Sequence, residues 1–275
     1  MGRIGVGIGV ALVKLGPKLF KVLKALKGLK ALGAVGSVAA YSWMFSWQMA
    51  IAIITLLFVH EYGHIWAMKK TGMKVKGIYF IPFLGGAAVP DEDFKSRTQE
   101  SYVAIMGPIF GLGLSLMVLM IHFITGQEMY AGIASWMALI NAFQFLPINP
   151  MDGGRIIKSI FMSIKQKIGL IVMALGFVLG IYLLFALHIW LFVILLMIGI
   201  LEFSIEYALY KNKKKPNKAK YPIEYSRWLL NQNRMAPKQM VAYSGLYILI
   251  LGILLSVMFY AQEIPGAREA LNVLM

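Results

Sequence analysis

Two long stretches without a formal charge constrain this chain more than any other feature. Residues 31–59 and residues 168–201 contain no Asp, Glu, Lys or Arg. A run of about 20 apolar residues is long enough to cross the hydrocarbon core of a bilayer as a helix. The composition agrees, because 59% of the residues are hydrophobic, only 14% are charged and the mean hydropathy is +0.72. The sequence therefore predicts a polytopic membrane protein.

The predicted fold class is an all-α membrane protein with about six or seven spanning helices and one short membrane-embedded β-hairpin. The run at 31–59 is too long for a single span, so we divide it into a helical hairpin of residues 31–46 and 48–68. Further spans are predicted at residues 101–122, 131–149, 168–186, 189–208 and 241–260. Residues 75–90 are too short and too rich in Gly and Pro for a spanning helix, and they predict the β-hairpin, with a surface loop as the alternative.

Basic residues gather in the segments that connect these spans. The formal net charge is +15, and residues 69–76, 155–167 and 211–238 are rich in Lys, whereas the opposite connections carry almost no charge. Cytoplasmic loops carry an excess of Lys and Arg, so these segments are expected on the cytoplasmic side of a plasma-membrane protein. The charge is explained by attraction to an anionic lipid bilayer, and no nucleic-acid partner is expected.

The N-terminal segment, residues 1–30, is strongly basic and contains no acidic residue. Its apolar run at residues 4–13 is followed by lysines instead of a small-residue cleavage site, so we do not expect a secretory signal. We expect a basic helix that lies on the membrane surface, and a regulatory arm is the alternative.

The pattern H-E-x-x-H closes the first uncharged run at His60, Glu61 and His64. Residues four apart share one face of a helix, so the two imidazoles can bind one metal ion. Glu61, turned about 100° from His60, is then placed to take a proton from water rather than to bind the metal. Ionisable groups inside a membrane are expensive and are therefore candidates for function. A chance match at a helix end is the alternative.

A third protein ligand is expected, because catalytic zinc commonly has three protein ligands. The chain has no cysteine, so the ligands must be His, Asp or Glu. We expect Asp152, since Pro147 and Pro150 end the preceding helix and Gly153-Gly154 free the backbone to turn the carboxylate inward. Glu202 is the second candidate, although it could instead pair with a lysine. His122 and His188 are expected at the opposite membrane surface, and a capped turn is the alternative reading of Asn149–Gly154.

These two motifs, with the Gly-Gly strand and Gly107-Pro108 between them, resemble the site-2 protease family of intramembrane zinc metalloproteases. The resemblance covers roughly residues 30–165 and implies a three-helix catalytic core with one zinc. It implies that His60, His64 and Asp152 are the zinc ligands and that Glu61 is the catalytic acid and base. It also implies that the segment at Gly85 and Gly86 receives the substrate as an extended strand.

One position departs from the family pattern. Members often carry Asn eight residues before the ligand Asp, where this chain has Gln144, with Asn141 one turn earlier. Either amide could hold the substrate backbone or an oxyanion. The substrate-binding candidates are therefore Gly85, Gly86, Asn141, Gln144 and Asn149.

The predicted function is hydrolysis of peptide bonds in or near transmembrane segments, with the active site toward the cytoplasmic side of the plasma membrane. Two alternatives remain: a membrane zinc peptidase for small or lipidated peptides, and a non-catalytic membrane binding or immunity protein. The expected partners are a transmembrane substrate and lipid, and a regulatory partner or a homo-oligomer is compatible with the sequence. The predicted divisions are residues 1–30, the catalytic core at 31–165, further helices at 166–210, a basic linker at 211–240 and a last helix and tail at 241–275.

Overall fold

The computed structural model describes residues 29–44, 46–81, 85–188, 192–212, 215–219 and 221–263. The predicted interfacial segment, residues 1–30, lies outside this part of the chain except for its last two residues. The elements follow in the order α2 (Leu29–Met44), α3 (Trp47–Lys70), β1 (Val75–Ile81), β2 (Gly85–Pro90), α4 (Arg97–Thr125), α5 (Glu128–Gln144), α6 (Asp152–Ile164), α7 (Gln166–Leu187), α8 (Phe192–Asn212), α9 (Pro222–Gln232) and α10 (Pro237–Glu263).

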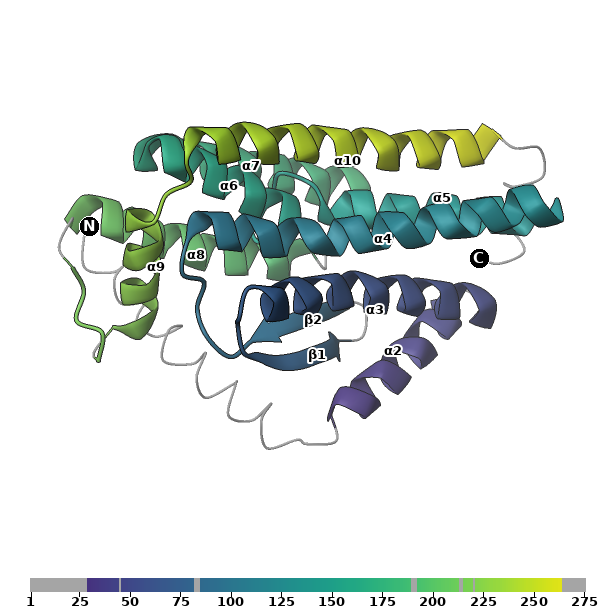
Figure 1. Ribbon diagram of the computed structural model, residues 1–275. Coiled ribbons are helices and arrows are strands. Elements are labelled where there is room, and N and C mark those ends of the chain that lie inside the picture. Colours follow the sequence, from purple (N-terminus) through teal and green to yellow (C-terminus); the bar gives the residue numbers. More distant parts are fainter. Residues whose placement is uncertain are drawn as a thin grey trace.

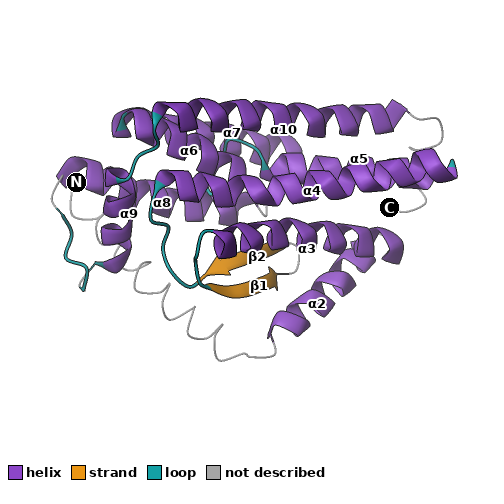
Figure 2. Ribbon diagram, in the orientation of Figure 1, coloured by secondary structure: helices purple, strands orange, loops and turns teal. Residues whose placement is uncertain are grey.

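Helix α4 lies at the centre of the bundle. It packs against α3 on one side and against α5, α6 and α10 on the others, and α7 and α8 follow behind α6 (Figure 1). The two strands lie along α3 on the side away from α4, and α2 packs against β1 (Figure 2). Helix α9 is short and runs across the end of the bundle, next to α8. Helix α4 therefore lies next to both α3 and α6, the helices that carry the two motifs.

Strands β1 and β2 form the β-hairpin that the sequence predicts at residues 75–90. They pair antiparallel from Ile81 opposite Gly85 to Val75 opposite Pro90, with an irregularity between Val75 and Gly77. A spanning helix is excluded here, as expected from the Gly and Pro content. The depth of the hairpin in the membrane stays a prediction.

Five helices are long and apolar enough to cross a membrane among the residues that the structure describes. They are Trp47–Lys70, Arg97–Thr125, Gln166–Ala186, Val193–Asn212 and Pro237–Ala261. Helices α2 and α5, which we also predicted as spans, contain 16 and 17 residues. At 1.5 Å per residue they are about 24–26 Å long, shorter than the roughly 30 Å of hydrocarbon. A multi-pass membrane protein is supported, and the count of six or seven spans is not.

Helix α4 is longer at both ends than the predicted span at 101–122. The Ser96 hydroxyl accepts a hydrogen bond from the Gln99 backbone at 3.1 Å and caps the first turn. Gly126, in the left-handed conformation, ends the helix. The two charged side chains of this first turn, Arg97 and Glu100, are both buried.

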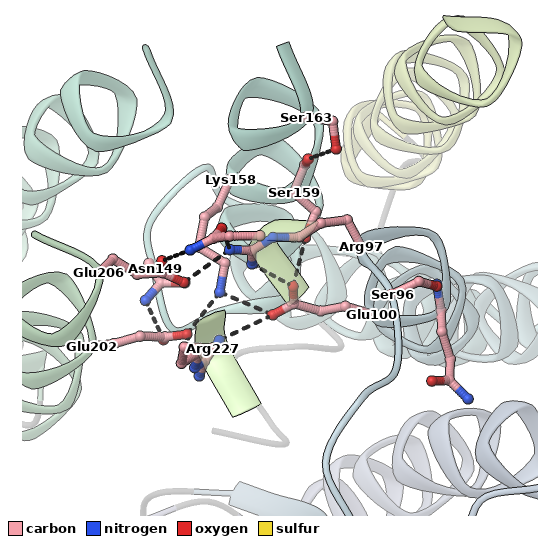
Figure 3. A network of polar contacts seen from close by, with 12 residues as sticks. Ser96, Arg97, Glu100, Asn149, Lys158, Ser159, Ser163, Glu202, Glu206 and Arg227 are labelled. Atoms are coloured by element: carbon pink, nitrogen blue, oxygen red, sulfur yellow. Dashed lines mark hydrogen bonds and ion pairs between the residues drawn. The ribbon is translucent and has the colours of Figure 1, made fainter. Parts of the chain in front are cut away.

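A network of buried charges, which we call the ionic cluster, joins four helices at one end of the bundle (Figure 3). Its three cations and three carboxylates balance, and the cluster explains how charged groups are tolerated at this depth. The members are Arg97 and Glu100 on α4, Lys158 on α6, Glu202 and Glu206 on α8, and Arg227 on α9. The region predicted as a basic linker therefore contains a helix, α9, that is tied to the bundle by Arg227.

Replacing Arg97 should strongly destabilise the bundle. Its guanidinium lies 2.9 Å from both Glu100 and Glu206 and is fully buried, so Arg97→Met leaves two carboxylates without this partner. We expect a loss of about 3–5 kcal/mol in the free energy of unfolding. Arg234→Met, at an exposed arginine, is the matched control and should change stability little. Unfolding in mixed detergent micelles measures both, and equal stabilities would contradict the assigned role of the ionic cluster.

Candidate metal centre

The structure brings the three predicted ligand residues together at the junction of α3 and α6. His60 and His64 lie one turn apart on α3, and Asp152 is the first residue of α6. Asp152 Oδ2 lies 2.9 Å from His60 Nε2 and 3.1 Å from His64 Nε2, and the two Nε2 atoms are 3.1 Å apart. Ligand atoms around a tetrahedral zinc ion are about 3.3 Å apart. The three buried side chains therefore lie close enough to form a metal site.

Hydrogen bonds on the far side of each imidazole fix its proton. His60 Nδ1 lies 2.9 Å from Asn141 Oδ1, while the Asn141 amide nitrogen donates to the Pro108 carbonyl at 2.9 Å. His64 Nδ1 lies 2.8 Å from the Val103 carbonyl. Since these oxygens only accept, both Nδ1 atoms carry hydrogen, and in the neutral imidazole each Nε2 atom then presents a lone pair.

This arrangement directs three electron-pair donors at one point. The two Nε2 atoms and the Asp152 carboxylate face one another, and in the neutral imidazoles both Nε2 atoms are unprotonated. Lone pairs that converge in a buried site repel each other unless a cation lies between them. Two imidazoles and a carboxylate are a donor set that suits zinc, and the outer hydrogen bonds are of the kind that orient metal-bound histidines.

Helix α4 makes room for the imidazoles at Gly107. A Cβ atom at this position would lie only 2.7 Å from His60 Nε2 and even closer to the His64 ring. Gly107 was not assigned to the site from the sequence. The next residue, Pro108, also contributes, because its carbonyl accepts the hydrogen bond from Asn141. Both residues of this Gly-Pro pair on α4 therefore shape the site.

Glu61 is buried and its carboxylate faces strand β2. Its Oε2 accepts a hydrogen bond from the Ala88 backbone N–H at 2.6 Å. Gly86 allows this approach, because a Cβ atom there would lie 2.6 Å from Glu61 Cγ. The structure therefore places one of the two predicted strand glycines directly against Glu61. Gly85 begins β2 and lies near Leu57 instead.

The turn before Asp152 is held by backbone contacts. Helix α5 ends at Gln144 and not at 149, because Pro147 and Pro150 interrupt the helical hydrogen bonds. We expected Gly153 and Gly154 to free the backbone, and this prediction was wrong. They are the second and third residues of α6, and neither has a positive φ. Their role is close packing, because a Cβ atom on either would collide with the backbone of residues 145–149.

The remaining candidates have other partners. Glu202 is outside the metal group and contacts Lys158 and Asn149. His122 Nδ1 contacts the Gln127 carbonyl near the end of α4. His188 follows α7 in the left-handed conformation and is exposed. None of these three joins the ligand set among the residues that the structure describes.

The side-chain amides predicted to bind substrate differ in their hydrogen-bond partners and in their burial. Asn141 already uses both ends of its amide, with His60 and Pro108, and the Asn149 nitrogen donates to Glu202. Gln144 is half-buried at the end of α5. A role in substrate binding stays a prediction for each. The carbonyl of Val103 and the N–H of Ala88 were missed, because backbone groups leave no signal in residue type.

Removing the Asn141 amide should weaken zinc binding. Asn141→Ala leaves the His60 Nδ1 hydrogen without its acceptor, so the imidazole loses its fixed orientation. Such outer partners are typically worth about 10–100-fold in metal affinity. Competition with a chromophoric zinc chelator measures this change on the purified protein. Gln144→Ala, three residues along the same helix, serves as control and should bind zinc as the wild type does. Unchanged affinity in Asn141→Ala would refute the assigned role.

Comparison with known proteins gives one family match and several similar proteins. Residues 48–135 match the model of peptidase family M50. A zinc metalloprotease of Methanocaldococcus jannaschii is 33% identical over 117 residues, which cover 39% of this chain and 34% of that protein. A protein of Synechocystis sp. is 28% identical, covering 47% and 36%, and the protein Rip3 of Mycobacterium tuberculosis is 25% identical, covering 44% and 33%. The names of both contain the words zinc metalloprotease.

The chain matches about a third of the length of each of these relatives. The matched part includes the H-E-x-x-H helix, and the family model ends before Asp152. The resemblance to the site-2 protease family is thereby confirmed over the first motif: residues 48–135 match peptidase family M50, and similar proteins are named zinc metalloproteases.

Proposed function

We propose that this protein is a membrane zinc metalloprotease that hydrolyses peptide bonds in or near transmembrane segments of other membrane proteins. The observation that carries the proposal is the group of three convergent, buried lone-pair donors with a buried carboxylate beside it on the same helix. That helix, α3, is long and apolar enough to span a membrane. His60 lies about 20 Å along its axis from Trp47, at 1.5 Å per residue, which is compatible with a site within the bilayer.

His60, His64 and Asp152 would hold the zinc ion. Zinc in such a site acts as a Lewis acid toward a carbonyl oxygen and makes water nucleophilic at neutral pH. The two imidazoles keep their Nδ1 protons throughout, because Asn141 and Val103 bind them. Asp152 contributes the negative charge of the donor set.

Glu61 would serve as the general base and then as the general acid. Its carboxylate accepts the proton that the attacking water loses, and it returns that proton to the leaving amine nitrogen. A metal site with a purely structural role needs no such carboxylate. The buried position of Glu61, against β2, also places the base next to a strand that can receive a peptide.

The edge of β2 that faces away from β1, toward Glu61, is the proposed binding site for the substrate backbone. In an antiparallel pair, alternate residues direct their N–H and C=O groups to opposite edges. Ala88 directs its N–H to Glu61 and therefore away from β1, and Gly86 shares that edge. An extended peptide that adds to this edge would lie with its backbone beside Glu61.

The side of the membrane to which the site opens is proposed from the distribution of basic residues. The basic segments on both sides of the metal ligands favour an active site that opens toward the cytoplasm, in the plasma membrane. The partners would be a transmembrane protein or peptide and the lipid bilayer, and a regulatory partner or a second copy of the chain would be compatible with this arrangement.

Glu61→Gln should retain zinc and lose proteolysis. The amide cannot take a proton, so cleavage of a co-expressed single-span membrane peptide should fall about 100- to 10,000-fold. Zinc content of the purified protein should remain near one per chain, whereas Asp152→Ala should lose zinc as well. Mass spectrometry of the products locates the cut. A cut only in soluble peptides would favour a peptidase for small peptides, and full activity of Glu61→Gln would exclude the proposed chemistry.

Gly86→Ala should impair cleavage without loss of metal. The added methyl group would lie 2.6 Å from Glu61 Cγ, so the base or the strand must shift. A displacement of about 1 Å near reacting atoms can reduce the rate about 100-fold. Gly113→Ala, on α4 with open space around the glycine, is the matched control and should cleave normally. If both variants cleave as the wild type does, β2 does not act at the site as proposed.

A further inference from the structure

The turn at residues 145–151 leads directly into the ligand Asp152 and is enclosed by neighbouring helices. Gly176 on α7 approaches the Pro147 carbonyl, and Gly199 on α8 approaches the Asn149 carbonyl, so closely that a Cβ atom would lie 2.7 and 2.5 Å from these oxygens. Helix α8 therefore touches the backbone of the turn three residues before the ligand.

The side chain of Asn149 is fixed by the same helix. It is 4% exposed, and its amide nitrogen donates to Glu202 Oε2. Its Oδ1 has no hydrogen-bond partner among the described residues, so Glu202 alone determines how this amide is oriented. Glu202 lies three residues after Gly199 and hence on the same face of α8.

The second oxygen of Glu202 reaches the other side of the ligand. Glu202 Oε1 accepts a hydrogen bond from Lys158 Nζ at 2.7 Å, and Lys158 lies on α6, the helix that Asp152 begins. Arg227 on α9 pairs with the same oxygen. Burial disfavours the charged form of Arg227, but the carboxylates of Glu202 and Glu100 outweigh this and raise the pKa of Arg227 above its usual value. Figure 3 shows Glu202 between Asn149 and these two cations.

We propose that Glu202 is a positioning residue for the metal centre, which holds the Asp152 carboxylate in place by binding Asn149 before it and Lys158 after it. This inference rests on the proposed zinc site and gives the ionic cluster a role in it. Glu202 touches neither zinc ligand nor substrate. It acts through the turn and the first turns of α6, between which Asp152 is located.

A carboxylate suits this task better than a neutral group. Hydrogen bonds to an ionised acceptor are about twice as strong as neutral ones, and the low dielectric of the bundle strengthens them further. Residues that hydrogen-bond a metal ligand directly commonly change metal affinity about 10–100-fold, and we expect an effect of similar size from a group that fixes the backbone on both sides of a ligand.

Glu206 is a matched control within the same cluster. It lies one turn further along α8 and is fully buried. Among the described residues its partners are Arg97 and Asn231, and neither of these belongs to the turn or to α6. Glu206→Gln thus disturbs the ionic cluster as Glu202→Gln does, without touching the residues around Asp152.

The experiment compares zinc dissociation constants of full-length wild type, Glu202→Gln and Glu206→Gln in detergent, together with thermal unfolding of the zinc-free proteins. We expect zinc to bind Glu202→Gln about 10–100-fold more weakly and Glu206→Gln within about threefold of wild type, while both zinc-free variants unfold at similarly lowered temperatures. Equal zinc affinity of the two variants would overturn the proposal.

A charge exchange tests the contact itself. Asn149→Asp alone opposes two carboxylates and should weaken zinc binding, whereas Asn149→Asp combined with Glu202→Gln restores a hydrogen bond of reversed direction and the original net charge. We expect the double variant to recover zinc affinity to within several-fold of wild type. Additive losses would contradict the proposal. If Glu202→Gln fails to fold, Asn149→Ala takes its place in the comparison of single variants with Glu206→Gln.

The outcome also separates this inference from the proposed function. His60→Ala must lose zinc binding if the metal site is as proposed. Wild-type protein that binds no zinc, or binds it regardless of His60, would refute the metal centre itself. Zinc binding that depends on His60 but not on Glu202 would refute only the positioning role.

Discussion

Convergence of three lone pairs inside a membrane-type bundle is the constraint on which the rest of the structure depends. Two histidines can share a face of one helix by local geometry alone, but the third donor must come from a distant segment. Bringing Asp152 to α3 requires α4 to pass between with a glycine at 107, and requires helix α5 to stop early enough for the chain to turn back. The outer hydrogen bonds of Asn141 and Val103 then decide which nitrogen each ring presents.

Much of the site could be predicted from sequence, because its motifs are local. The H-E-x-x-H spacing defines its geometry on any helix, and Pro147, Pro150 and the acid at 152 mark a turn in an otherwise apolar span. The strands at 75–90 were also predictable, since Gly and Pro exclude a helix there. These features depend on residue type and spacing along one segment, and the folded structure adds only their relative placement.

The errors came from groups whose partners lie far away in sequence. Glu202 was the second candidate ligand because depth along a helix does not reveal which way a side chain points; the alternative, pairing with a lysine, is the one found, with Lys158 and Asn149 as partners. Arg97 and Glu100 lie before the predicted span at 101–122, and opposite charges on α8 and α6 allow both to be buried within the longer helix. The role of Gly153 and Gly154 depends on what approaches them, and a single sequence does not contain that information.

The glycines around residues 145–151 have a consequence for how the site responds to motion. Side chains between two packed elements can absorb small shifts by changing rotamer. Here α6, α7 and α8 each also meet the turn at a glycine, with backbone against backbone, and at these points no side chain lies between them. Any sliding of these three helices is transmitted directly to the carboxylate that begins α6. The geometry of the ligand set is thus a property of how the whole bundle is assembled.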